Sequence, residues 1–273
     1  MSTQNESTKT RITTNTLRKM KDRGEKIVCL TAYDATFAGI MDDAGVEVIL
    51  VGDSLGMVIQ GEETTVPVTM DHMVYHSRLV GRAARRALIM LDMPFMSFAT
   101  PTDALANAAR LMRAGPGHMV KIEGGAHQAG IVRELTAQGI PVCAHIGLRP
   151  QSIHKMGGYL IQGRGDLAAR AMIEDAHILE EAGADILLLE CIPATLAREI
   201  TETAGIPVIG IGAGKDCDGQ ILVLYDMLGI TRGRIPKFVR DFLPEGKSVP
   251  AAIAAYVAAV KAGEFPGPEH EFQ

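Results

Sequence analysis

Short apolar runs alternate with amphipathic, Ala-rich segments along almost the whole chain. Eight runs have the length and β-rich character of strands: residues 27–31, 48–52, 88–92, 119–123, 142–146, 186–190, 208–211 and, most weakly, 221–224. Helical periodicity covers residues 102–114, 131–138, 166–182, 195–204 and 249–263. Several of these helical segments end in a glycine, as helix C-caps often do.

The strands are apolar on both faces and are separated by helices. This pattern predicts a parallel sheet, because parallel neighbours need crossover connections. Six or fewer units would favour an open sheet, whereas eight close a barrel. The chain has 273 residues, near the roughly 250 of one such barrel. We therefore predict an α/β protein with a single (βα)8 TIM barrel over residues 16–273, after a flexible N-terminal tail over residues 1–15.

Two predicted loops, residues 53–68 and 147–165, are unusually long and rich in glycine and polar residues. Each leaves the carboxyl end of a predicted strand. In a barrel this end is the catalytic face, and long loops there are commonly lids or substrate walls.

The composition excludes several classes of function. The net charge is −5 and there is no extended basic cluster, so a nucleic-acid partner is not expected. No apolar stretch approaches the roughly 18 residues of a membrane span, and the polar N-terminus lacks an export signal. The four cysteines form no C-x-x-C pair, which favours buried free thiols and a cytoplasmic protein.

Charged or titratable residues stand where apolar runs stop. They are Asp53, Asp92, Glu123, His145 and Glu190. Burying such side chains among apolar neighbours is costly unless they are paired or bind a metal. Because the strand ends of a barrel converge on one mouth, we predict a shared active site there.

Lys121 and Glu123 are two residues apart in the fourth predicted strand, so they point to the same side. The flanking apolar residues would face the helices, which leaves the charged pair toward the barrel axis. A lysine among carboxylates suits an anionic substrate. A purely structural Lys–Glu ion pair is the alternative.

Asp53, Asp92 and Glu123, with no nearby Cys–His set, are typical ligands of a hard, oxygen-preferring cation, and Mg²⁺ fits best. A 2-oxo acid bound to this cation would have its enolate stabilised. Glu190, two strands away from Glu123, is then free to act as the general base.

Two further patterns resemble sites. His72 and His76 have the spacing of zinc ligands, but Met73 stands where a zinc peptidase motif has Glu, so a surface or packing role is expected. The run GIGAGK at residues 210–215 resembles a phosphate loop without the Walker A spacing. It is interpreted as a tight turn, with a bound phosphate or glutamate tail as the alternative.

Seven runs between residues 31 and 240 resemble, in order, the ketopantoate hydroxymethyltransferase family: VGDSLGMVIQG, LDMPFMSFATP, MVKIEGG, HIGLRPQSIHKMGGYLIQGR, LLLECIP, IPVIGIGAGKDCDGQILV and PKFVR. The resemblance implies a Mg²⁺-dependent barrel similar to the phosphoenolpyruvate/pyruvate superfamily. It implies transfer of a hydroxymethyl group from 5,10-methylenetetrahydrofolate to 3-methyl-2-oxobutanoate. It also implies a cytoplasmic homo-oligomer, often a decamer.

Residue by residue, the resemblance makes Asp53, Asp92 and Glu123 the metal acids, with Asp53 and Asp92 also against the substrate. Ser54 and Lys121 match the residues that hold the 2-oxo acid. Glu190 matches the proton acceptor, and His145 matches a histidine near the substrate.

The chain departs from the family pattern in loops. Arg149 stands in place of Thr, Leu160 in place of Lys, and residues 115–118 contain one extra residue. These changes bear on folate contacts and leave the strand-end acids in place. Two other functions are the alternatives: a Mg²⁺-dependent C–C lyase acting on 2-oxo or 2-hydroxy acids, and a barrel that only binds a ligand or organises an assembly.

Overall fold

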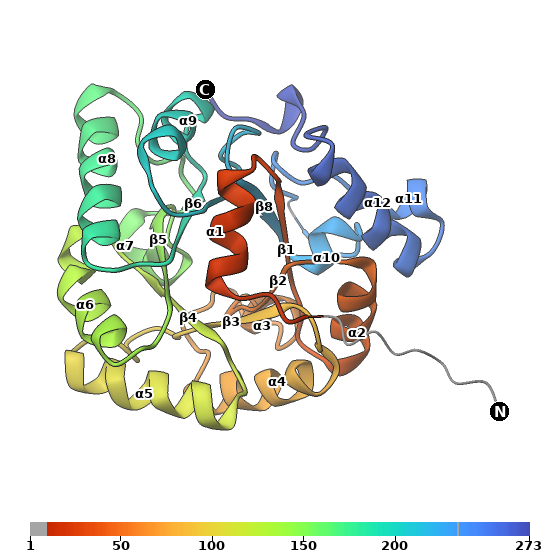
Figure 1. Ribbon diagram of the computed structural model, residues 1–273. Coiled ribbons are helices and arrows are strands. Elements are labelled where there is room, and N and C mark those ends of the chain that lie inside the picture. The colour runs from red at the N-terminus through yellow and green to blue at the C-terminus, as the bar shows by residue number, and fades with distance from the viewer. Residues whose placement is uncertain (1–9, 234) are drawn as a thin grey trace.

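Eight parallel strands close into a barrel surrounded by helices (Figure 1) in the computed structural model, which describes residues 10–233 and 235–273. The strands pair in chain order, and β8 closes the barrel against β1. The predicted (βα)8 barrel is confirmed. The strands are β1 Ile27–Thr31, β2 Val48–Val51, β3 Leu88–Asp92, β4 Met119–Glu123, β5 Val142–Gly147, β6 Ile186–Glu190, β7 Val208–Ile211 and β8 Gly219–Leu222.

The eighth strand begins two residues earlier than predicted, at Gly219 instead of residue 221. Glycine is needed there because a Cβ at this position would lie 2.7 Å from Ile209 Cδ1 and 2.8 Å from Ile27 Cβ. Leu224, predicted to end the strand, instead begins a helix, and its backbone N–H donates to Thr31 Oγ1 at 3.0 Å. The apolar pattern alone could not distinguish these two roles.

The predicted helices form within about two residues of their expected ends, as α5, α6, α8, α9 and α12. The helices are α1 Thr14–Asp22, α2 Ala35–Ala44, α3 Leu55–Val58, α4 Met70–Ala83, α5 Pro101–Ala114, α6 Ala129–Ala137, α7 Ile153–Met156, α8 Asp166–Glu181, α9 Ala194–Thr203, α10 Leu224–Met227, α11 Leu243–Gly246 and α12 Val249–Lys261. Short 3₁₀ turns add η1 Ala126–Gln128, η2 Pro150–Ser152 and η3 Pro268–His270.

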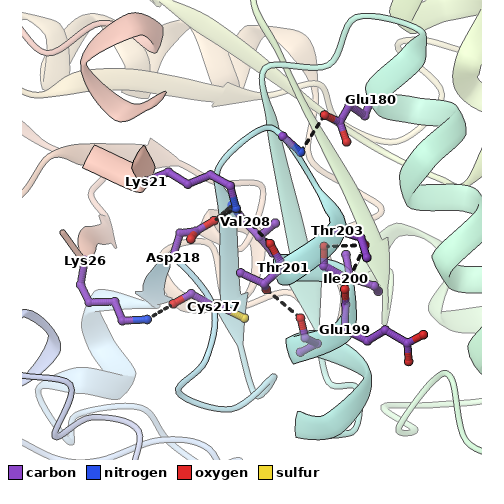
Figure 2. A network of polar contacts seen from close by, with 12 residues as sticks. Lys21, Lys26, Glu180, Glu199, Ile200, Thr201, Thr203, Val208, Cys217 and Asp218 are labelled. Carbon is purple, nitrogen blue, oxygen red and sulfur yellow. Dashed lines mark hydrogen bonds and ion pairs between the residues drawn. The ribbon is translucent and has the colours of Figure 1, made fainter. Parts of the chain in front are cut away.

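Helix α1 lies across the end of the barrel where the strands begin (Figure 1). Lys21 Nζ on this helix is 2.7 Å from Asp218 Oδ2 and donates to Thr201 O at 3.0 Å. Figure 2 shows that Asp218 also contacts the start of β7, where its Oδ2 accepts from Val208 N at 2.9 Å. Leu17 and Met20 bury the apolar face of α1. The barrel is therefore covered at the end opposite the predicted site.

Residues 1–9 of the predicted flexible tail lie outside the described residues, whereas residues 10–15 belong to the fold. Arg11 donates to Ala87 O at 3.2 Å and Ile12 is buried. Thr13 caps α1, which begins at Thr14. Packing therefore starts before the predicted domain boundary at residue 16, because a short polar segment can be held by hydrogen bonds that its composition does not reveal.

The four cysteines are all buried and free, as predicted. Among the described helices, none is long and apolar enough to span a membrane.

Candidate active site

The structure brings the strand-end side chains together at one mouth of the barrel. Strand register pairs Asp92 with Lys121 and Glu123 with His145, and residues paired in this way share a face of the sheet. All four of these residues are at most 5 % exposed, while the Glu190 side chain is 15 % exposed. The predicted clustering is thus observed, with Glu190 nearest to solvent.

A continuous chain of polar contacts crosses this mouth from β3 to β6. Lys121 Nζ lies 2.8 Å from Asp92 Oδ1 and 3.4 Å from His145 Nδ1. The His145 ring reaches two carboxylates, with Nδ1 3.6 Å from Glu123 Oε1 and Nε2 3.3 Å from Glu190 Oε2. His145 therefore connects the acids of β3 and β4 to Glu190.

Burial and neighbouring charges set the protonation of the cluster. The pKa of Asp53 is raised well above its usual range by burial and by the nearby carboxylates Asp92 and Glu123. Burial alone would lower the pKa of Lys121, but Asp92, Glu123 and Asp53 raise it overall, so the ammonium stays charged. Burial and Lys121 oppose protonation of His145, yet its hydrogen bonds to Glu123 and Glu190 raise its pKa. The protonation state of each residue in the cluster therefore depends on the charges of the others.

The side chains of Asp53, Asp92 and Glu123 are not arranged as a complete set of metal ligands. Among the described residues, no group of three or more His, Cys, Asp or Glu side chains is arranged to hold an ion. Asp92 Oδ1 is nevertheless fully buried, with the Lys121 ammonium 2.8 Å away. Three buried carboxyl groups, Asp53, Asp92 and Glu123, surround this single lysine. Burial and the repulsion from Asp92 and Glu123 raise the pKa of Asp53, and a divalent cation would offset this cost.

Two residues of the site, Gln151 and Tyr33, were not predicted from the sequence. Gln151, 5 % exposed, donates from Nε2 to Asp53 Oδ2 at 2.8 Å and to Met93 O at 2.9 Å. Its backbone N–H donates to Glu123 Oε2 at 3.1 Å. A residue of the loop after β5 thus holds acids that follow β2 and end β4. No local pattern reveals it, because these partners lie far away in the sequence.

Tyr33 is the second missed residue, and it lies two positions after the end of β1. Its hydroxyl is 2.8 Å from Ser54 Oγ, and its carbonyl lies 2.8 Å from His76 Nδ1. Tyr33 is 2 % exposed, and burial raises the pKa of its phenol, so the hydroxyl stays protonated. The signal was the one used for the acids, a polar group just past a strand.

The two long loops meet over the mouth. Loop 53–68 carries α3, and loop 147–165 carries η2 and α7. Tyr159 Oη lies 3.5 Å from Met57 Sδ, so the loops touch directly. They form walls of the site on the side of β2 and β5.

The discounted patterns have structural roles. His72 completes a capping box at the start of α4, where Thr69 N donates to its Nδ1 at 3.3 Å. The glycine-rich turn at 210–215 is occupied from within the chain, because Lys215 N donates to Glu271 Oε1 at 3.2 Å. Phe272 also packs against the turn, 3.1 Å from where a Cβ on Gly212 would lie. An external phosphate or glutamate tail is therefore not needed to satisfy this turn.

The fold and the acid–base cluster at the carboxyl mouth define a (βα)8-barrel enzyme. A family model described as ketopantoate hydroxymethyltransferase matches residues 11–268. The chain belongs to this family.

Relatives with this name are similar in sequence to the chain over almost their whole length. The chain is 61 % identical over 256 residues to a 3-methyl-2-oxobutanoate hydroxymethyltransferase of Nitrosococcus oceani, covering 94 % of this chain and 97 % of that one. It is 60 % identical over 262 residues to the enzyme of the same name from Marinobacter nauticus, covering 96 % and 99 %.

Solved structures share the fold at low identity. A phosphonopyruvate hydrolase in complex with oxalate and Mg²⁺ superposes with a TM-score of 0.60 at 14 % identity, covering 77 % of this chain and 80 % of that one. A 2,3-dimethylmalate lyase of the PEP mutase/isocitrate lyase superfamily gives a TM-score of 0.57 at 16 % identity, covering 79 % of each.

Proposed function

We propose that this protein transfers a hydroxymethyl group from 5,10-methylenetetrahydrofolate to 3-methyl-2-oxobutanoate, giving 2-dehydropantoate, a precursor in pantothenate and coenzyme A biosynthesis. The activity named for relatives that are about 60 % identical over nearly the whole chain supports this assignment. In the net reaction the oxo acid loses a proton from C3 and gains the folate methylene carbon, water supplies the hydroxyl oxygen, and tetrahydrofolate is released.

Asp53, Asp92 and Glu123 would hold the divalent cation, which we assign as Mg²⁺. Their oxygens are the donors that this ion prefers, and the mutual repulsion of these buried carboxyl groups supports the fit. When bound, Mg²⁺ would polarise the keto group of the oxo acid and make its C3 proton more acidic. The structure of a phosphonopyruvate hydrolase with Mg²⁺ and oxalate, a small dianion, supports cation chemistry on this fold.

Lys121 and Ser54 bind the oxygens of the 2-oxo acid in this proposal. Lys121 brings a buried positive charge, and Ser54 is oriented by the Tyr33 hydroxyl at 2.8 Å. Glu190 accepts the proton from C3. His145, 3.3 Å away through Nε2, orients the Glu190 carboxylate and connects it to Glu123.

The observation that carries the mechanism is that Glu190 is joined through His145 to the same cluster as Lys121 and the three acids. The test is isotope exchange: the enzyme is incubated with 3-methyl-2-oxobutanoate and Mg²⁺ in D₂O without folate, and loss of the C3 proton is followed by NMR. Glu190→Gln should slow exchange by about 10²–10⁴-fold, the usual contribution of a general base. Glu202→Gln, an exposed change on α9, is the matched control. Exchange at the wild-type rate in Glu190→Gln would place the base elsewhere.

A C–C lyase of the same superfamily is the alternative function. Lyases of that kind use a loop cysteine as general acid, but loops 53–68 and 147–165 contain no cysteine. All four cysteines of the chain are buried. A barrel that only binds a ligand is disfavoured because every strand-end acid is present. Turnover that requires tetrahydrofolate separates the proposed activity from both alternatives.

We also propose a cytoplasmic homo-oligomer, a decamer by family resemblance. Four free thiols suit a reducing compartment. Large apolar side chains at the surface, such as Tyr75 at 61 % and Leu167 at 86 % exposure, support subunit contacts. Light scattering of the purified protein measures the subunit number.

A further inference from the structure

A cavity of about 450 Å³ lies beside the mouth, between the ends of β4 and β5 and helix α8. Gly125, two residues after Glu123, and Gly147, which is in register with Glu190, both line it. The cavity therefore shares its wall with the strand ends that carry the site. Its volume is in the range of small-molecule sites.

The lining of this cavity carries two cationic side chains, Arg149 and Lys155. The acidic residue in the lining, Asp175, is engaged by the backbone, since its Oδ1 accepts from Ala126 N at 2.7 Å. In the described part of the chain, neither Arg149 nor Lys155 has a carboxylate within ion-pair distance. Two cations against one carboxylate leave the lining with a net positive charge, which predicts an anionic ligand.

One more feature favours an anion with an apolar body. Ile146 and Met172 form an apolar part of the wall. A ligand with a flat apolar part and a terminal carboxylate would suit both this wall and the two cations.

We propose that this cavity binds the p-aminobenzoyl-glutamate half of the folate co-substrate. Arg149 and Lys155 pair with the glutamyl carboxylates, and the aromatic ring lies against Ile146 and Met172. This inference rests on the proposed function. The glycine-rich turn at 210–215, the other candidate for an anionic tail, is occupied by Glu271.

Binding of a fragment tests the site without turnover. p-Aminobenzoyl-glutamate is titrated into the full chain by calorimetry, with p-aminobenzoate, which lacks the glutamate, as comparator. The glutamate-bearing fragment should bind more tightly, and Arg149→Gln should weaken it about ten-fold, the usual loss of one charge-assisted contact. Arg149→Lys keeps the charge and should stay within about three-fold of wild type. Arg170→Gln, which removes a charge from helix α8 outside the cavity lining, is the matched control.

Kinetics separate this inference from the proposed function. In Arg149→Gln the KM for 5,10-methylenetetrahydrofolate should rise about ten-fold, while the KM for the oxo acid and folate-independent C3 exchange stay unchanged. With a methylenetetrahydropteroate substrate, which has no glutamate, Arg149→Gln and wild type should perform alike. A folate-dependent wild type whose folate KM is unaffected by both Arg149→Gln and Lys155→Gln would overturn the cavity assignment but keep the function. Absence of folate-dependent turnover in the wild type would overturn the function itself.

Discussion

Removing the Gln151 side chain should loosen Asp53 while leaving Glu123 held. Gln151→Ala deletes two buried hydrogen bonds, at 2.8 Å to Asp53 Oδ2 and at 2.9 Å to Met93 O. The bond to a carboxylate is worth about 1.5–3 kcal/mol and the bond to a carbonyl about 0.5–1.5 kcal/mol. The expected loss of stability is therefore roughly 2–4.5 kcal/mol. The backbone N–H to Glu123 survives the substitution.

Urea denaturation followed by circular dichroism measures this loss. Gln138→Ala, an exposed glutamine just after α6, is the matched control and should cost less than about 0.5 kcal/mol. A double-mutant cycle with Asp53→Ala isolates the contact, and its coupling energy should be about 1.5–3 kcal/mol. If Gln151→Ala costs no more than Gln138→Ala, or if the coupling is near zero, Gln151 does not hold the acid.

Two further changes test the cluster and the surrounding fold. Asp92→Asn should weaken Mg²⁺ binding at least about ten-fold in calorimetry, because a charged oxygen ligand is lost; unchanged affinity removes Asp92 from the ligand set. His118 accepts from Ile89 N at 2.9 Å, and burial together with Arg11 lowers the pKa of His118 to about 4. The unfolded chain takes up this proton near pH 6.5, so stability falls as the pH drops from about 6.5 toward 4, by an amount on the order of 1–2 kcal/mol after allowing for partial exposure. His118→Asn should remove this part of the pH dependence, and equal pH slopes for both proteins would contradict it.

The fold was largely readable from sequence because the strands carry their own signal. A parallel barrel buries both faces of each strand, so seven strands appear as mainly apolar runs at nearly their true limits. The prediction for the eighth strand was wrong by two residues because its first residues, Gly219 and Gln220, are not apolar. They serve close packing of the backbone and a polar contact instead. Gly219 avoids a clash, and Gln220 Nε2 donates to Gly214 O at 2.9 Å.

The site was predictable where function and topology coincide. Asp53, Asp92, Glu123 and Glu190 end or follow strands, and barrel closure brings such positions together whatever their separation in sequence. Gln151 was missed because it reaches the acids from a loop, and loop geometry is fixed by contacts with distant residues. The protonation of the cluster depends on distances among side chains, which only coordinates supply.

The position of α1 has a consequence for how the chain is made. Lys21 binds Asp218, which lies almost two hundred residues later, and the apolar residues Leu17 and Met20 are buried by the finished barrel. During synthesis this helix emerges well before Asp218. Until Asp218 is made the helix has no complete docking surface, so we expect closure of the barrel to be a late, long-range step of folding.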